Sequence, residues 1–103
     1  MTDLRLVLAA IEPPLADAWE RFCGDLACVT IHRGSILEVE ADAVVSPANS
    51  FGFMDGGIDD LYMEYFGSDI QLGVRRQIYD HHGGELLVGA ADIVETGDSA
   101  MPF

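Results

Sequence analysis

The stretch from Ser46 to Asp60 (SPANSFGFMDGGIDD) contains the residues best suited to bind a small anionic molecule. It contains three glycines, of which Gly56 and Gly57 are adjacent and directly precede a predicted helix. Glycine lets the main chain approach a ligand closely, and the free amides of a first helical turn favour an anion such as phosphate. Asn49 offers both a donor and an acceptor, which suits sugar hydroxyls. The stretch therefore predicts a main-chain site for an anionic, sugar-bearing small molecule.

Three aspartates, Asp55, Asp59 and Asp60, lie close to this predicted site. Aspartate is a common cap at the start of a helix, where it also interacts well with the helix dipole. A carboxylate near a ribose could instead bind a hydroxyl group or orient a water molecule for attack. Both interpretations stay open for Asp59 and for Asp60.

Apolar patterns along the chain predict alternating strands and helices. Short, largely apolar runs predict strands at residues 4–11, 26–32, 41–46 and 86–95, the first of them buried on both faces. Apolar stripes at helical spacing predict helices at 13–23, 58–66 and 69–82, with glycine stops after the first and the last. This order predicts a layered α/β fold with a largely parallel sheet. Ligands bind such sheets at the carboxyl ends of the strands, which is where the stretch from Ser46 begins.

Length and charge narrow the classes of function. A chain of 103 residues fits a single domain, 1–103. The formal net charge of −13 disfavours duplex nucleic acid and anionic membrane surfaces as partners. The sequence shows no signal peptide and no apolar run long enough to cross a membrane, so we expect a cytoplasmic protein. Neither a dinucleotide fingerprint nor a P-loop is present, and His81-His82 lacks a third ligand, so we expect no cofactor and no metal.

Three motifs in a fixed order resemble the macrodomain family. They are Gly34-Ser35-Ile36, the run ADAVVSPAN at 41–49, and Gly56-Gly57-Ile58. The family's pattern is G-D-I, then D-x-[IV]-V-N-A-A-N, then G-G-G-[VI], and the resemblance covers about residues 26 to 103. The sequence of the central loop is similar to a bacterial and phage branch of the family. The resemblance implies a three-layer α/β/α fold with a mixed, largely parallel sheet.

The resemblance also implies a ligand. Macrodomains bind ADP-ribose or a related nucleotide-diphosphate ribose, and some hydrolyse ADP-ribosyl groups from proteins or nucleic acids. The ligand-binding residues implied by position are Ser35, Ile36, Asn49, Gly56, Gly57 and Ile58. Among them, Ile36 would lie beside the adenosine half and Asn49 would hold the distal ribose. The glycine pair and the backbone around Ile58 would line the diphosphate and the distal ribose. Asp59 falls where hydrolytic members have a catalytic aspartate.

Several positions differ from the family pattern. Ser35 replaces the aspartate that usually binds the adenine amino group, Ser46 replaces the first asparagine of N-A-A-N, and Met63 stands where some hydrolases have a histidine. The chain also has no lysine, which excludes a lysine-dependent covalent mechanism. Three functions therefore stay open: an ADP-ribose reader or hydrolase, a non-catalytic binding or interaction module, and a degenerate truncated copy without a ligand.

The family fold continues with further strands, a helix and a second glycine-rich phosphate loop. The resemblance therefore implies that the fold of this chain is incomplete at its C-terminus. An incomplete sheet would have an unpaired edge, which predicts a tendency to self-associate.

Overall fold

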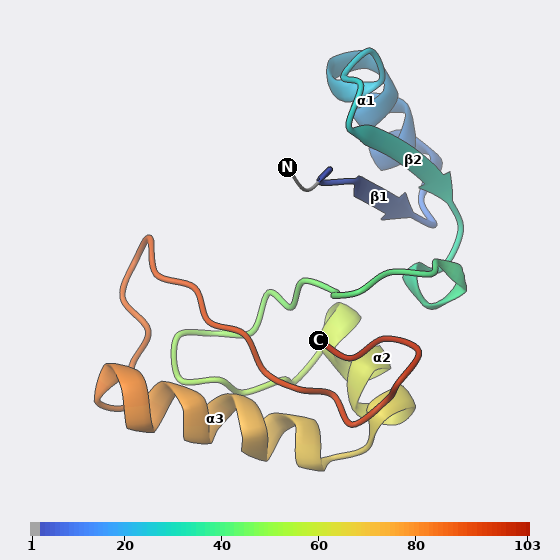
Figure 1. Cartoon of the computed structure of the whole chain (residues 1–103). Helices are drawn as coiled ribbons and strands as arrows, with labels where there is room; N and C mark the ends of the chain where they lie inside the picture. Colours follow the sequence, from blue (N-terminus) through green and yellow to red (C-terminus); the bar gives the residue numbers. More distant parts are fainter. Residues whose placement is uncertain (1–2) are drawn as a thin grey trace. The chain divides into compact units, whose positions relative to one another are not determined.

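The chain forms two compact units, Met1–Glu40 and Ala41–Phe103, and the computed structural model describes residues 3–103 (Figure 1). They are called here the N-terminal unit and the C-terminal unit. A parallel two-stranded sheet lies in the first, and two α-helices lie in the second. The protein therefore combines helices with parallel strands, which agrees with the predicted α/β class. Among the described residues, no helix has the length and apolar content needed to span a membrane.

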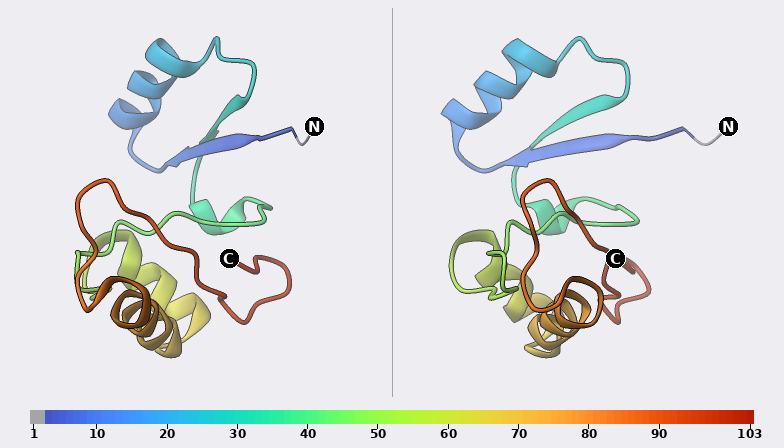
Figure 2. Two further views of the ribbon diagram at one scale, coloured as in Figure 1. Left: turned by 60° about the vertical axis from the view of Figure 1, so that its left-hand side comes forward. Right: turned by 90° about the vertical axis from the view of Figure 1, so that its left-hand side faces the viewer.

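The N-terminal unit is a strand–helix–strand motif followed by a short 3-10 helix. Strands β1 (Leu6–Ala10) and β2 (Val29–Arg33) pair in parallel, with Leu6 opposite Val29 and Ala10 opposite Arg33. Helix α1 (Pro13–Cys23) lies against the strand pair, as Figure 2 shows, and η1 (Ile36–Glu38) follows β2. Two prolines open α1, in agreement with their preference for a first helical turn. The predicted parallel pair and the first helix are confirmed.

The first strand is much more exposed than its apolar composition predicts. Leu6 is 44% exposed, and only Ala10 of this strand is buried. The expectation of burial on both faces was wrong, because within this unit a single α-helix covers the two-stranded sheet. A parallel sheet needs helices on both faces before a strand becomes fully buried.

The C-terminal unit is built on two helices that pack together. Helix α2 (Gly57–Phe66) begins at the predicted glycine pair, and α3 (Asp69–His82) has the bounds that the sequence predicted. Gly83 caps α3 in the left-handed conformation, with φ of 71°, which favours glycine at that position. Irregular segments at 41–56 and 83–103 complete this unit and run beside the helices (Figure 2).

The strands predicted at 41–46 and 86–95 are not formed. Val44 donates its amide to Phe103 O at 2.9 Å, and Phe103 N donates to Asp42 O at 3.2 Å, in the pattern of a single parallel bridge. No longer ladder follows in the part of the chain that the structure describes. A strand is stabilised by its neighbours, so an apolar run without a partner stays irregular. Val88, in the second run, is fully exposed for the same reason.

Tyr62 is the largest fully buried side chain of the C-terminal unit. It is 1% exposed, and its hydroxyl donates to Val45 O at 3.0 Å. This bond attaches the irregular segment at 41–46 to α2, although that segment has no strand partner. The burial of Tyr62 is the main cause that raises its pKa, and the nearby Asp59 carboxylate adds to it.

Removing the Tyr62 hydroxyl should weaken this attachment. We expect Tyr62→Phe to lower the free energy of unfolding by about 1 kcal/mol, since the Val45 carbonyl loses its donor while the ring stays in place. Urea titration followed by far-UV circular dichroism measures the change. Tyr65→Phe is the matched control on the same helix, because Tyr65 is 51% exposed. An equal loss of unfolding free energy in both variants would show that the Tyr62 hydroxyl does not stabilise this attachment.

Candidate functional site

The start of α2 has open main-chain amides. Gly56 precedes the helix with φ of 112° and ψ of 163°, and Gly57 opens it with φ of 57°. A Cβ atom built on either glycine would have no protein atom within 4 Å. No side chain caps this end of the helix, and the amides of Gly56, Gly57 and Ile58 have no hydrogen-bond partner among residues 3–103. These three residues, called here the amide cradle, are free to donate to an anion.

Asn49 is committed in part to the loop itself. Its Oδ1 atom accepts hydrogen bonds from the amides of Phe51 at 3.0 Å and Phe53 at 3.2 Å. The Asn49 carbonyl accepts from Gly52 N at 2.9 Å, so one residue organises the whole turn. The Asn49 side-chain NH₂ group makes no hydrogen bond within the described residues. The sequence predicted that both the donor and the acceptor of this carboxamide could bind a sugar. In the structure the donor is the group that is available to a sugar hydroxyl.

The loop between Asn49 and the cradle is closed by other contacts. Met54 N donates to the Gln71 side chain at 2.9 Å, which attaches the loop to α3. The Arg75 guanidinium lies over the Phe53 ring, 4.1 Å from its centroid, and its Nε donates to Phe51 O at 3.4 Å. One face of the Phe53 ring is thus covered by a side chain of the protein. The amides of the four residues from Phe51 to Met54 are thus occupied, whereas those of the cradle are open.

Asp59 differs sharply from its neighbour Asp60. Asp59 is 4% exposed, although it lies in the first turn of α2, whereas Asp60 is exposed. Ser46 Oγ donates to Asp59 Oδ1 at 2.6 Å, and the same hydroxyl accepts from Ala48 N at 3.2 Å. A buried carboxylate requires such a partner, because an unpaired one is costly to desolvate. This contact between residues 46 and 59 is not visible in the sequence, which showed Ser46 only as a departure from a family pattern.

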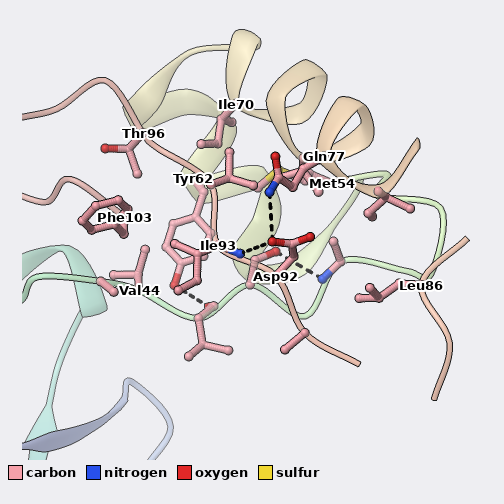
Figure 3. Close-up of a pocket in the computed structure, with 18 of the residues that line it drawn as sticks. Val44, Met54, Tyr62, Ile70, Gln77, Leu86, Asp92, Ile93, Thr96 and Phe103 are labelled. Atoms are coloured by element: carbon pink, nitrogen blue, oxygen red, sulfur yellow. Dashed lines mark hydrogen bonds between the residues drawn. The ribbon is translucent and has the colours of Figure 1, made fainter. Parts of the chain in front are cut away.

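A cleft of about 500 Å³ lies beside these residues in the C-terminal unit (Figure 3). Apolar side chains from both helices and both irregular segments make most of its lining. They include Val44, Met54, Tyr62, Ile70, Ile93 and Phe103. Ser46 and Asn49 also belong to the lining, so the cleft adjoins the loop that leads to the amide cradle. The amide cradle and Asp59 do not belong to this lining, so the cleft and the cradle adjoin through the loop and are not one cavity.

Asp92 forms a polar cluster within the cleft lining. Gln77 Nε2 donates to Asp92 Oδ1 at 3.0 Å, and Asp92 Oδ2 lies 2.9 Å from His82 Nε2 and 3.5 Å from His81 Nδ1 (Figure 3 shows the Gln77 contact). Ile93 N also donates to the carboxylate, at 2.8 Å. The Gln77 bond first, then the Ile93 and His82 bonds, hold the pKa of Asp92 far below its usual range. The cluster attaches the irregular segment at 86–96 to the last turns of α3.

The Asp92 cluster should make stability depend on pH. Because the pKa of Asp92 is lower in the folded than in the unfolded protein, its contribution is present at neutral pH and is lost as pH falls from about 5 toward 2. We expect Asp92→Asn to lower the urea midpoint at pH 7, with a difference from the wild type that shrinks in acid. Asp80→Asn, an exposed position on α3, is the control that should show no such trend. If the difference in urea midpoint between the wild type and Asp92→Asn grows in acid, the Asp92 carboxylate does not stabilise the fold in this way.

The predicted site residues divide between the two units. Asn49, the amide cradle and Asp59 all lie in the C-terminal unit, within one loop and the first turn of α2. Ser35 and Ile36 lie in the N-terminal unit, where Ser35 caps η1. Ser35 Oγ accepts from Leu37 N at 3.2 Å, and Ser35 N donates to the Glu38 carboxylate at 2.7 Å. The backbone bond from Ser35, and then His32, hold the pKa of Glu38 below its usual range.

Comparison with known proteins yields relatives without an assigned function. An uncharacterized protein of Aquifex aeolicus is 42% identical over 43 residues, which cover 42% of this chain and 26% of that protein. An uncharacterized protein of Pyrobaculum aerophilum is 36% identical over 69 residues, which cover 67% of this chain and 37% of that protein. The chain thus spans well under two thirds of either relative. No family model and no solved structure matches the chain.

Proposed function

We propose that the C-terminal unit binds ADP-ribose or a related nucleotide-diphosphate ribose. The observation that supports this most directly is the amide cradle, whose unpartnered N–H groups lie at the positive end of the α2 dipole. In this proposal the diphosphate lies on the cradle, and the Asn49 side-chain NH₂ donates to a hydroxyl of the distal ribose. The macrodomain resemblance points to the same ligand. We also propose, on that resemblance, that the complete fold has three α/β/α layers.

Binding to main-chain amides suits a protein of this charge. The chain carries a formal net charge of −13, and the C-terminal unit has Arg75 and Arg76 as its only arginines and no lysine. A diphosphate therefore finds few cationic side chains here. An anion can instead be held by the dipoles of main-chain amides, where glycine lets the main chain approach it closely.

Isothermal titration calorimetry with ADP-ribose tests the proposal. We expect saturable heat with a Kd below about 1 mM, which corresponds to about −4 kcal/mol. AMP and ribose 5-phosphate are the matched controls, because each lacks the diphosphate, and both should bind more weakly. Absence of heat at millimolar ADP-ribose would contradict the proposal.

Hydrolysis of ADP-ribosyl groups is a second candidate, favoured by the burial of Asp59 beside the cradle. Water would attack the anomeric carbon of the distal ribose, forming a carbon–oxygen bond as the bond from that carbon to the acceptor breaks. The acceptor leaves with the bonding electron pair, and Asp59 takes a proton from the attacking water. Amides of the cradle would position the diphosphate during this step. Binding of ADP-ribose without turnover would instead identify a non-catalytic module.

A further inference from the structure

The Ser46 hydroxyl connects two parts of the candidate site. Its proton is donated to Asp59 Oδ1 at 2.6 Å, and its oxygen accepts from Ala48 N at 3.2 Å. Ala48 directly precedes Asn49, whereas Asp59 belongs to the first turn of α2, which begins at Gly57. One side chain thus ties the turn that carries Asn49 to the helix end that carries the amide cradle.

Among residues 3–103, Ser46 is the side chain that holds the Asp59 carboxylate by a hydrogen bond. Asp59 is 4% exposed, yet within residues 3–103 its carboxylate receives a side-chain hydrogen bond from Ser46 alone. The Tyr62 hydroxyl belongs to the same helix but donates to Val45 O at 3.0 Å, so it is not available to the carboxylate. Oδ1 of Asp59 is therefore fixed, while Oδ2 has no hydrogen bond to a described residue and stays free for a ligand or a water.

We propose that Ser46 is a positioning residue, which orients the Asp59 carboxylate and holds the Asn49 turn at the correct place relative to the amide cradle. This inference rests on the proposed function, since it assigns Ser46 a role in the same ADP-ribose site. The Ser46 hydroxyl both donates and accepts a hydrogen bond here, and threonine offers the same hydroxyl. Alanine removes both bonds at once and leaves the Asp59 carboxylate unpaired.

The first test is spectroscopic and needs no ligand. The NMR chemical shift of the Asp59 side-chain carboxyl carbon should change in Ser46→Ala and stay close to the wild-type value in Ser46→Thr. Ser68→Ala is the control, because Ser68 is exposed and its side chain forms no cap bond at the start of α3. An Asp59 shift that is the same in the wild type and Ser46→Ala would overturn the proposal.

The second test measures the affinity for ADP-ribose. We expect Ser46→Ala to raise the Kd about tenfold, since the turn that carries Asn49 is then no longer tied to the helix end that carries the cradle, and Ser46→Thr to restore the wild-type Kd. If the wild type binds and Ser46→Ala binds equally well, the positioning role is wrong. If the wild type does not bind but the Asp59 shift still responds to Ser46→Ala and not to Ser46→Thr, the proposed function fails while the link from Ser46 to Asp59 stands.

Discussion

Replacing Gly56 by valine should weaken the binding of ADP-ribose by about 100-fold or more, because the main chain can then no longer approach the diphosphate and about two charge-assisted bonds are lost. Gly56 adopts φ of 112° and ψ of 163°, a conformation that side-chain-bearing residues rarely adopt. The space beside it is open, so a new side chain would project into the volume assigned to the ligand. Calorimetry on the variant measures the loss.

Gly67 provides a matched control for this substitution. It ends α2 with φ of 93° and ψ of 162°, close to the conformation of Gly56, and a Cβ built on it also has no atom within 4 Å. Gly67→Val should therefore cost similar stability, about 1 to 3 kcal/mol, while the affinity of the folded protein stays the same. The corresponding alanine variants serve if either valine variant does not fold. Equal losses of affinity at both ends of α2 would show that backbone strain, rather than the cradle, explains the effect.

Asp59→Asn should lower the release of ADP-ribose from a modified substrate by at least about 100-fold, the usual contribution of a general base. The asparagine carbonyl can still accept from Ser46 Oγ, so the turn and the affinity for ADP-ribose should change little. Single-turnover release from an ADP-ribosylated peptide and from an ADP-ribosylated single-stranded oligonucleotide measures the loss and identifies the acceptor.

Asp60→Asn is the control for this variant, because Asp60 is the exposed neighbour of Asp59 in the same helical turn. It should retain wild-type turnover. Full activity of Asp59→Asn would remove Asp59 from the mechanism. If the wild type binds ADP-ribose but releases none from either substrate, the chain is a binding module and Asp59 has only the structural role that its bond to Ser46 shows.

The helices of this protein could be predicted closely from local sequence signals. Pro13 and Pro14 mark the start of α1, and Gly83 marks the end of α3, at the residues where the structure places them. Helix signals are local because both partners of a helical hydrogen bond lie within one turn. The strand predictions at 41–46 and 86–95 failed because a strand needs a partner, and apolar composition alone does not provide one.

The candidate site shows the same division between local and distant information. The glycine pair and the helix start that form the cradle were visible in the sequence, because both are local features. The bond from Ser46 to Asp59 and the position of Arg75 over Phe53 join distant residues, so no local pattern reveals them. Asn49 was predicted to face a sugar with both its donor and its acceptor. The structure instead shows its acceptor bound to the amides of Phe51 and Phe53.

The three main-chain amides of the cradle can be observed individually. In an amide proton–nitrogen correlation spectrum, titration with ADP-ribose should shift the resonances of Gly56, Gly57 and Ile58 most strongly. The resonances of Gly67 and Gly83, at the ends of α2 and α3, should move little. If ADP-ribose leaves the resonances of Gly56, Gly57 and Ile58 unchanged at saturation, or shifts them no more than that of Gly67, the amide cradle does not bind the diphosphate and the proposed function is contradicted.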